Sequence, residues 1–321
     1  MPNIAVIFPN EGSQYVGMGK EFYDRTVNVR NYFDIIEKLL DIKVARLCFL
    51  GPKEDQQPTA MAHLITLLGD VAFYDPFAQN KRKANLMMGI GIGEIAALVV
   101  AECITFPIAC QYVYKRAALI DAFAKKHGGV NVFFSGVTLD KLEPLLNPPT
   151  GPIVITQYLA PDTFILWGPQ ASLTPLMDRY KTIRTVRSTV LSPRGPLFTN
   201  QAIELEMQCD ALLTECLGET RLFPPKIITH RVSDGEQINS PTDVRDVLVK
   251  QYSQPVDWNR AVKLIIDRGF RTWVATRSDH RVARRQSSLR DIDTHPTTSP
   301  RNEPNFLIFH DTSPFRFVSN Y

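Results

Sequence analysis

Strand-like and helix-like stretches alternate along most of this 321-residue chain, and this alternation limits the fold more than any other feature of the sequence. Alternating strands and helices are typical of a parallel sheet with helices packed on its faces. Short apolar runs predict strands at 4–8, 86–88 and 272–275. Helical periodicity predicts helices at 29–40, 59–74, 94–101, 107–123, 201–217 and 259–268. The sequence therefore predicts an α/β architecture with a mainly parallel sheet.

The pattern changes between residues 129 and 190. There it predicts, in order, a strand, a helix, two strands, a helix and a strand, at 130–137, 139–146, 153–157, 163–167, 171–180 and 185–190. The order βαββαβ is the signature of a ferredoxin-like module. We therefore expect a discontinuous large domain (1–128 and 191–275), an inserted subdomain (129–190) and a C-terminal extension that is first basic and then apolar (276–321).

Composition indicates a globular protein. A hydrophobic fraction of 44% over this length supports a large core. Five cysteines without a CxxC pair fit a reducing compartment. No stretch approaches the roughly 20 apolar residues that span a bilayer, so we expect no membrane span. Residues 4–8 are typical of a strand rather than of a signal peptide, which leaves the cytoplasm and, after removal of a transit peptide, an organelle matrix open.

Positive charge is concentrated near the C-terminus. The net charge is only +3, but residues 268–301 hold eight arginines against three acidic residues. Such a segment suits a phosphate group or an acidic protein, or it is a solvated face of the tail. The candidate partner-binding residues are Arg277, Arg281, Arg284, Arg285 and Arg290. The apolar stretches 305–309 and 315–318 are expected to pack on the body or on a partner.

A glycine-rich loop follows the apolar run 84–88 and reads Gly89-Ile-Gly-Ile-Gly-Glu94. Strand, sharp turn and helix form a nucleophile elbow, whose middle residue holds a hydroxyl out for attack on an acyl group. Here that residue is Gly91, which has no side chain that can attack. Shifting the motif by one residue recovers no hydroxyl or thiol, because the neighbours are Ile90 and Ile92.

Several motifs in order resemble one enzyme family. They are Phe8-Pro-Asn-Glu-Gly-Ser-Gln14, the loop 89–98, the helix segment Val113-Tyr-Lys-Arg116, Ala160-Pro161, residues 191–198 and Gln251-Tyr-Ser-Gln-Pro-Val-Asp-Trp258. With these motifs the chain resembles the malonyl-CoA:acyl carrier protein transacylases up to about Ala275. The resemblance implies an α/β-hydrolase-like large domain with an inserted ferredoxin-like subdomain. It also implies that Arg116, Ile92 and Gln251 are remnants of the substrate-binding site, Arg116 as the arginine that grips a carboxylate.

The same comparison of motifs shows departures. The elbow serine and the histidine before it are Gly91 and Ile90, and the general-base histidine falls near Arg194, whose guanidinium stays protonated. Glu11 replaces a glutamine in the first loop, which otherwise reads Phe-Pro-Gly-Gln-Gly-Ser-Gln in the family. We expect Glu11 and Arg116 to form a bidentate pair. We also expect backbone donors to survive at Glu11 and Ile92, although the Glu11 carboxylate beside them would oppose a developing negative charge.

From these departures we predict that the chain is not an enzyme. We expect a degenerate transacylase that serves as a structural or assembly subunit. Its partner is acyl carrier protein or a larger protein or ribonucleoprotein assembly, such as a mitochondrial ribosome or its assembly intermediate, with RNA contact through the basic segment. The alternative is an active acyl-CoA:acyl carrier protein acyltransferase or thioesterase with another nucleophile, such as Ser13 or Ser192. We expect no cofactor, no metal and a location in the mitochondrial matrix, otherwise the cytoplasm.

Overall fold

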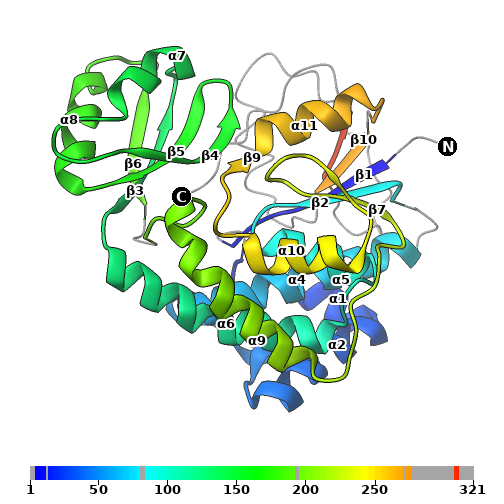
Figure 1. Cartoon of the computed structure of the whole chain (residues 1–321). Coiled ribbons are helices and arrows are strands. Elements are labelled where there is room, and N and C mark those ends of the chain that lie inside the picture. The colour runs from blue at the N-terminus through cyan, green and yellow to red at the C-terminus, as the bar shows by residue number, and fades with distance from the viewer. Residues whose placement is uncertain are drawn as a thin grey trace.

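Two sheets with their helices make up the structure (Figure 1). The computed structural model describes residues 4–11, 14–79, 84–191, 195–270, 272–275 and 307–310. The strands of the larger sheet are β1 (Ile4–Phe8), β2 (Leu86–Gly89), β7 (Ile228–His230), β8 (Gln237–Ile238), β10 (Thr272–Ala275) and β11 (Leu307–His310). They lie in the order β11-β10-β1-β2-β7-β8.

The centre of the larger sheet is parallel, as predicted. β1 lies between β10 and β2 and is parallel to both, and β2 is parallel to β7, whereas β8 and β11 pair antiparallel at the two edges. Residues 5–8 of β1 and 86–89 of β2 are all buried. A continuous apolar run is what a central strand needs when helices cover both of its faces.

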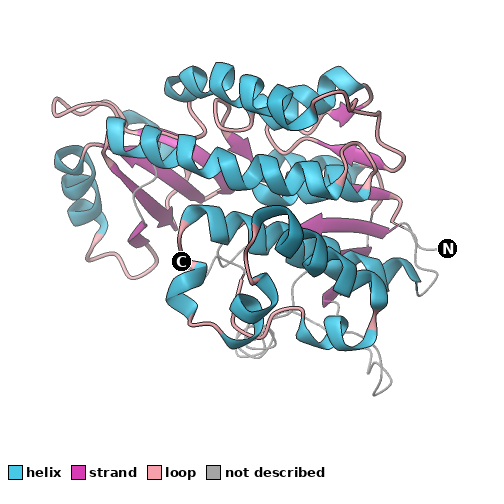
Figure 2. Cartoon of the chain, turned by 90° about the horizontal axis from the view of Figure 1, so that it is seen from below, coloured by secondary structure: helices cyan, strands magenta, loops and turns pink. Residues whose placement is uncertain are grey.

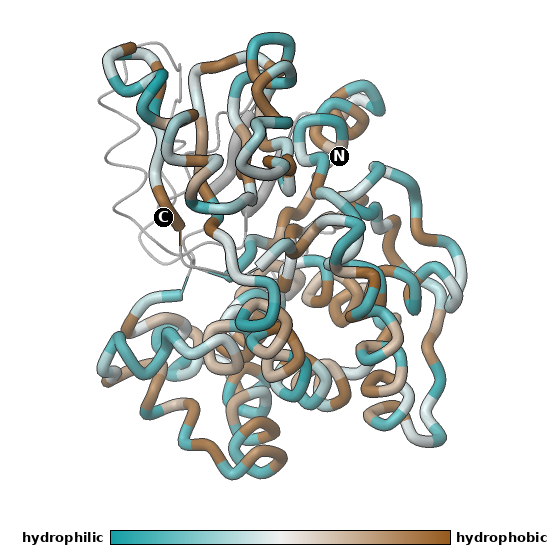
Figure 3. The backbone as a smooth tube through the Cα atoms, turned by 60° about the vertical axis from the view of Figure 1, so that its left-hand side comes forward, coloured by the Kyte–Doolittle hydropathy of each residue, from teal (hydrophilic) through white to brown (hydrophobic). Residues whose placement is uncertain are grey.

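Helices lie on both sides of these strands (Figure 2). They are α1 (Lys20–Arg25), α2 (Val27–Leu40), α3 (Val44–Leu50), α4 (Thr59–Gln79), α5 (Ile92–Val100), α6 (Phe106–His127), α9 (Ile203–Leu217), α10 (Pro241–Lys250) and α11 (Trp258–Asp267), with short 3-10 turns at Lys53–Gln56 and Asn200–Ala202. Apolar and polar residues alternate along most of them (Figure 3). This is the pattern of helices that bury one face. α4 packs against α5 and α6, and α6 packs against α9.

The smaller sheet carries the predicted βαββαβ order. Its elements are β3 (Val130–Ser135), α7 (Leu139–Leu142), a 3-10 turn (Glu143–Leu145), β4 (Val154–Ala160), β5 (Thr163–Gly168), α8 (Gln170–Tyr180) and β6 (Arg187–Leu191). The predicted helix over 139–146 changes to a 3-10 turn because Pro144 has no N–H for a helical hydrogen bond. This sheet has its own apolar core, which includes Val132, Phe134 and Leu166. The residue limits of the domains stay a prediction.

One strand of the smaller sheet was not expected. β9 (Val256–Asp257) pairs parallel with β4, which gives the strand order β6-β3-β5-β4-β9. β9 follows α10 and leads directly into α11. A segment between two helices of the larger part therefore completes the sheet of the smaller part.

Of the two C-terminal apolar stretches, the structure describes only residues 307–310. Leu307–His310 forms β11 and pairs antiparallel with β10. Within the part of the chain that the structure describes, no helix combines the length and the apolar character that crossing a bilayer requires.

The local sequence sets the start of α10, which positions the site. Ser240 accepts a hydrogen bond from the Asp243 backbone, and the Asp243 carboxylate accepts one from the Ser240 backbone (3.0 Å). Pro241 occupies the first helical turn, where no N–H is needed. This capping box fixes where α10 begins, and the helix ends at Lys250, immediately before Gln251.

Candidate functional site

The predicted elbow is present in the structure. β2 ends at Gly89, α5 begins at Ile92, and Gly91 between them has φ 56° and ψ −119°. Residues that have a side chain rarely adopt this backbone conformation, whereas glycine adopts it readily. A Cβ on Gly89 would overlap the Gly93 backbone, and a Cβ on Gly93 would overlap the Phe8 carbonyl. The tight turn of the elbow therefore accounts for Gly89, and the close packing of β1 against the elbow accounts for Gly93.

Asn10 accounts for the third glycine. A Cβ built on Gly91 would overlap the carboxamide oxygen of Asn10. The same oxygen, Asn10 Oδ1, accepts a hydrogen bond from the Ile92 backbone N–H at 3.0 Å. The carboxamide therefore fills the place of an elbow side chain and also takes the backbone donor expected at Ile92. Sequence reasoning missed Asn10, although a signal was available, because the resembled first loop has glycine at this position.

Glu11 and His63 form a buried pair beside this loop. His63 Nε2 of α4 lies 3.9 Å from Glu11 Oε1, and both side chains are almost completely buried. Burial and the positive charge of Arg116 lower the pKa of His63 to about 3. His63 is therefore neutral at physiological pH. Its Nδ1 atom has no hydrogen-bond partner among the described residues.

Arg116 of α6 is fully buried, and it contacts the end of α10. Its guanidinium donates to the Leu248 carbonyl (3.5 Å) and to the Tyr252 hydroxyl (3.3 Å). It also lies over the rings of Tyr112 and Tyr252, at 5.0 and 4.8 Å from their centroids. The expected bidentate pair with Glu11 is not among the Arg116 contacts in the described residues. Tyrosine rings and backbone take the place of a carboxylate around this arginine.

Gln251 joins the elbow to the end of α10. Its Nε2 atom donates to the Gly91 carbonyl at 2.6 Å and to Glu94 Oε2 at 2.8 Å. Glu94 Oε1 accepts from the Val232 backbone N–H at 3.0 Å. Burial raises the pKa of Glu94 to about 7, although its two hydrogen bonds oppose the rise. Of the predicted substrate-site residues, Ile92 and Gln251 thus meet at the elbow, and Arg116 contacts residues on either side of Gln251.

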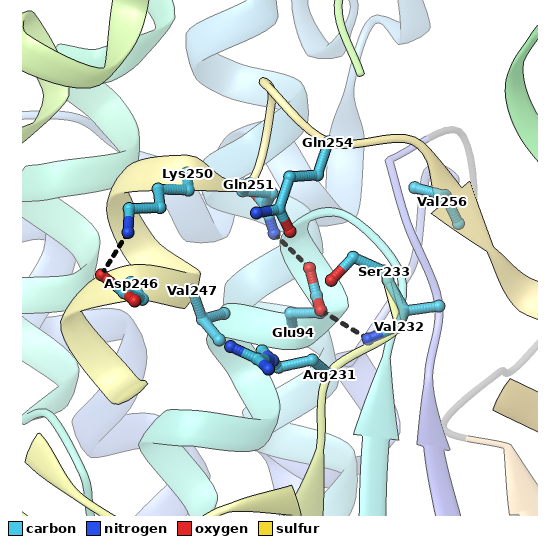
Figure 4. Close-up of a pocket in the computed structure, with 10 residues that line it drawn as sticks. All are labelled: Glu94, Arg231, Val232, Ser233, Asp246, Val247, Lys250, Gln251, Gln254 and Val256. Carbon is cyan, nitrogen blue, oxygen red and sulfur yellow. Dashed lines mark hydrogen bonds and ion pairs between the residues drawn. The ribbon is translucent and has the colours of Figure 1, made fainter. Parts of the chain in front are cut away.

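A small cavity of about 50 Å³ opens beside Glu94. The residues that line it are Glu94, Arg231, Val232, Ser233, Asp246, Val247, Lys250, Gln251, Gln254 and Val256 (Figure 4). Two ion pairs lie at its rim, Lys250 with Asp246 (3.0 Å) and Arg231 with Asp234 (2.7 Å). Figure 4 shows the Ser233 hydroxyl turned toward the Glu94 carboxyl. A carboxyl with a pKa near neutral can exchange a proton with a group in this cavity.

Some predicted site residues lie outside the described residues. They are Arg194, the alternative nucleophiles Ser13 and Ser192, and the partner-binding candidates Arg277, Arg281, Arg284, Arg285 and Arg290. Their roles stay predictions. Ile90, by contrast, is described and is buried in the turn of the elbow. Among the described side chains, no three His, Cys, Asp or Glu residues form a group that could hold a metal ion.

Comparison with known proteins identifies the relatives of this chain, although no family model matches it. A malonyl CoA-acyl carrier protein transacylase of Bacillus subtilis is 24% identical over 277 residues, which cover 85% of this chain and 86% of the relative. A probable mitochondrial malonyl-CoA-acyl carrier protein transacylase of Drosophila melanogaster is 24% identical over 280 residues, or 82% and 72% of the two chains. The chain is a homologue of the malonyl-CoA:acyl carrier protein transacylases.

Solved structures of transacylases share the fold of this homologue. The Coxiella burnetii enzyme superimposes with a TM-score of 0.77 at 23% identity, covering 88% of this chain and 89% of the other. A malonyl-transacylase in complex with a type II polyketide acyl-carrier protein gives 0.77 at 20% identity, covering 88% and 91%. The predicted α/β fold with a ferredoxin-like subdomain is therefore confirmed.

These comparisons correct one prediction about the homologue. We predicted that the chain is not an enzyme, and this prediction is wrong, because the relatives and the solved structures are named as transacylases, which are enzymes. The error was to conclude from one residue, Gly91, that the whole cleft has no catalytic activity. A glycine at residue 91 excludes a covalent acyl intermediate on that residue, but it does not describe what the other groups of the cleft do.

Proposed function

We propose that this protein acts on acyl carrier protein, as the subunit that binds the carrier within a larger assembly. The observation that carries the proposal is the elbow itself. Gly91 keeps the backbone angles of a strand-to-helix elbow, and Gln251 holds its carbonyl at 2.6 Å. A relative with the same fold is named for its complex with an acyl-carrier protein, which supports a carrier protein as the partner.

The edge of the smaller sheet offers a surface for such a partner. β6 is an edge strand of the smaller sheet, and Gly195, which follows it in the chain, lies against Ala124 of α6. Arg184 and Arg187 are exposed in this segment, and so are the apolar residues Ile183 and Val190. Positive charge beside apolar side chains complements an acidic protein that buries a small apolar patch. We therefore place the carrier protein on this surface, which we call the β6 surface (residues 183–190).

Binding of purified acyl carrier protein, measured by isothermal titration calorimetry, tests the proposal. Reversing both charges, Arg184→Glu with Arg187→Glu, is expected to weaken binding about tenfold or more and to reduce its salt dependence. The matched control is Arg179→Glu on α8, an exposed arginine of the same subdomain that lies outside the β6 surface. An equal loss in both variants, or no binding by the unmodified protein at low salt, contradicts the proposal.

A second candidate function is acyl transfer from an acyl-CoA to the carrier protein through a residue other than Gly91. The observation that favours it is Glu94, whose pKa is raised to about 7 in the cavity that also contains Ser233. In such a step Glu94 takes the proton of the Ser233 hydroxyl, the oxygen attacks the thioester carbonyl, and the CoA thiolate leaves. The acyl group then passes to the carrier thiol. Intact mass after incubation with malonyl-CoA tests this route, with Ser233→Ala as the control that must lose the adduct.

The location of the protein in the cell and the identity of the larger assembly have less support. The mitochondrial name of the Drosophila relative supports a mitochondrial matrix location. A ribonucleoprotein as the larger assembly is supported by the arginine-rich sequence of residues 268–301 alone. Purification of the tagged full-length chain from its own cells, followed by mass spectrometry of the co-purifying proteins with and without ribonuclease, tests both points.

A further inference from the structure

The carboxamide oxygen of Gln251 is a buried acceptor without a donor. Gln251 is one of the residues that line the cavity beside Glu94, and it is only 8% exposed. Its Oε1 atom has no hydrogen-bond partner among the described residues. Exchanging the two ends of the amide does not help, because Nε2 donates to the Gly91 carbonyl, which can only accept. Gln251 therefore holds an unpaired acceptor in a fixed orientation at this cavity.

Glu94 is the buried acid of the same cavity, and it has no counter-charge among the described residues. The two cations that line the cavity already have acidic partners, since Lys250 pairs with Asp246 at 3.0 Å and Arg231 pairs with Asp234 at 2.7 Å. Glu94 is only 7% exposed, and burial raises its pKa. An ionised carboxylate in this position is costly unless a cation lies beside it. A small cation inside the cavity would supply the missing charge.

Three acceptors of this cavity match the three N–H donors of a primary ammonium group. They are Gln251 Oε1, the Glu94 carboxylate and the Ser233 hydroxyl oxygen, which Figure 4 shows turned toward that carboxylate. A carboxylate oxygen accepts more than one hydrogen bond, so Glu94 can keep its 2.8 Å bond from Gln251 Nε2 while it binds an ammonium group. The unpaired amide oxygen and the unpaired carboxylate are thus satisfied by one ligand.

The size and the lining of the cavity limit this ligand. A volume of about 50 Å³ holds about three to five heavy atoms if each needs the space of one water molecule. Val232, Val247 and Val256 contribute apolar surface to the lining. The cavity therefore suits an ammonium group with a short alkyl chain.

We propose that the cavity beside Glu94 binds a small primary amine in its ammonium form. The ammonium group donates to Gln251 Oε1, to the Glu94 carboxylate and to Ser233 Oγ. The bound amine also fixes the Gln251 amide, whose other end holds the Gly91 carbonyl. This site needs neither the carrier protein nor the β6 surface. While it is occupied, the ion-paired Glu94 does not take up the proton of the Ser233 hydroxyl.

Saturation-transfer NMR of the full-length chain with methylammonium chloride as the probe tests the proposal. At an ionic strength held constant with sodium chloride, the methyl signal should report one saturable site. Its dissociation constant should be on the order of 10 mM, near the limit for a ligand of two heavy atoms. Tetramethylammonium carries the same charge without an N–H donor and should bind at least about tenfold more weakly. Replacing sodium by potassium should leave methylammonium binding unchanged.

Three variants locate the site. Ser233→Ala removes one acceptor and should weaken methylammonium binding about threefold to tenfold. Glu94→Gln removes the charge and should weaken it at least about tenfold. The matched control is Glu102→Gln, at an exposed carboxylate that pairs with Lys226, and it must bind as the unmodified protein does. Ser233 is only half-buried, so Ser233→Ala keeps the test decisive even if Glu94→Gln does not fold.

Three results overturn the proposal: no saturable binding by the unmodified protein, equal binding of tetramethylammonium or competition by potassium, and unchanged binding by Ser233→Ala. The measurement contains no CoA and no carrier protein. Its failure is therefore separate from the failure of either proposed function.

Discussion

Gln251 Nε2 lies 2.8 Å from Glu94 Oε2 and 2.6 Å from the Gly91 carbonyl, so one side chain ties a buried carboxyl to the turn of the elbow. The oxygen of this amide, Oε1, is buried without a hydrogen-bond partner among the described residues. A buried acceptor without a donor is costly.

Stability is expected to fall as pH rises through the range in which Glu94 ionises. The pKa of Glu94 is raised from 4.5 to about 7 in the folded protein. The folded state therefore binds more protons than the unfolded state between these values, and stability is lost as pH rises through about 7. The full difference amounts to about 3 kcal/mol. Glu94→Gln has no proton to lose, so its unfolding free energy relative to the unmodified protein should rise by about that amount from pH 4.5 to 8.

Urea denaturation across pH measures this difference. Comparing two variants at each pH cancels the opposite contribution of His63, whose lowered pKa favours the folded state at higher pH. Glu215→Gln, which removes an exposed carboxylate paired with Lys115, is the control and should show no such trend. A flat difference for Glu94→Gln would show that Glu94 ionises normally.

Adding a methyl group at the elbow is expected to destabilise the protein strongly. Gly91→Ala places a Cβ on the Asn10 carboxamide and on a backbone with φ 56°. We expect a loss of about 1–3 kcal/mol in unfolding free energy, from the strained backbone and from displacement of the Asn10 amide. Asn10→Gly should recover at least about 1 kcal/mol of it, because only the overlap is removed. A double-mutant cycle by urea denaturation measures the coupling, and the same cycle with Asn85→Gly should be additive within about 0.5 kcal/mol.

Lysine is not expected to replace Arg116. The buried guanidinium bonds to two groups at once and stacks between Tyr112 and Tyr252, which the ammonium of lysine cannot reproduce. Arg116→Lys should lose about 2–4 kcal/mol of unfolding free energy at pH 7. Arg245→Lys, at a more exposed pair with Asp210, should lose less than about 1 kcal/mol. Similar losses in the two variants would mean that burial of Arg116 contributes little.

Removing the capping box of α10, the helix that precedes Gln251, is expected to lower the stability of the protein and to loosen the helix. Ser240→Ala removes the side-chain oxygen that accepts from the Asp243 N–H at 3.1 Å. The expected loss is about 1 kcal/mol, together with faster hydrogen exchange in α10. Thr242→Ala, on the exposed side of the same turn, should leave both quantities unchanged. An unchanged Ser240→Ala variant would indicate that Pro241 alone fixes the start of α10.

The sequence predicted the parts of the fold that have a repeating pattern. The central strands at 4–8, 86–88 and 272–275 were predicted because their residues are continuously apolar, and the βαββαβ order was predicted because period two and period 3.6 alternate there. β7, β8 and β9 were missed, since two or three residues carry no period. α10 was missed despite its capping box, whose first residues Ser240 and Asp243 are a recognisable start signal.

The site was predicted less completely, because its contacts join residues far apart in the sequence. Gly91 was identified from its own motif, but Asn10 meets Ile92 across 82 residues, and Glu94 meets Gln251 across 157. A single sequence gives no measure of such distances. Arg116 was placed near Glu11 for its charge, whereas in the structure it contacts tyrosine rings and a carbonyl, and its Nε atom has no hydrogen-bond partner among the described residues.

β9 makes the smaller sheet mechanically continuous with the elbow. Its residues Val256 and Asp257 pair with Gln157 and Tyr158 of β4, and Gln251 lies five residues earlier in the chain. A force that tilts the smaller sheet, such as a partner pulling on β6, is therefore transmitted along this short connection to the amide that holds the Gly91 carbonyl. A movement that separates the two parts must therefore break the pairing of β9 with β4 or pull on the short connection between β9 and Gln251.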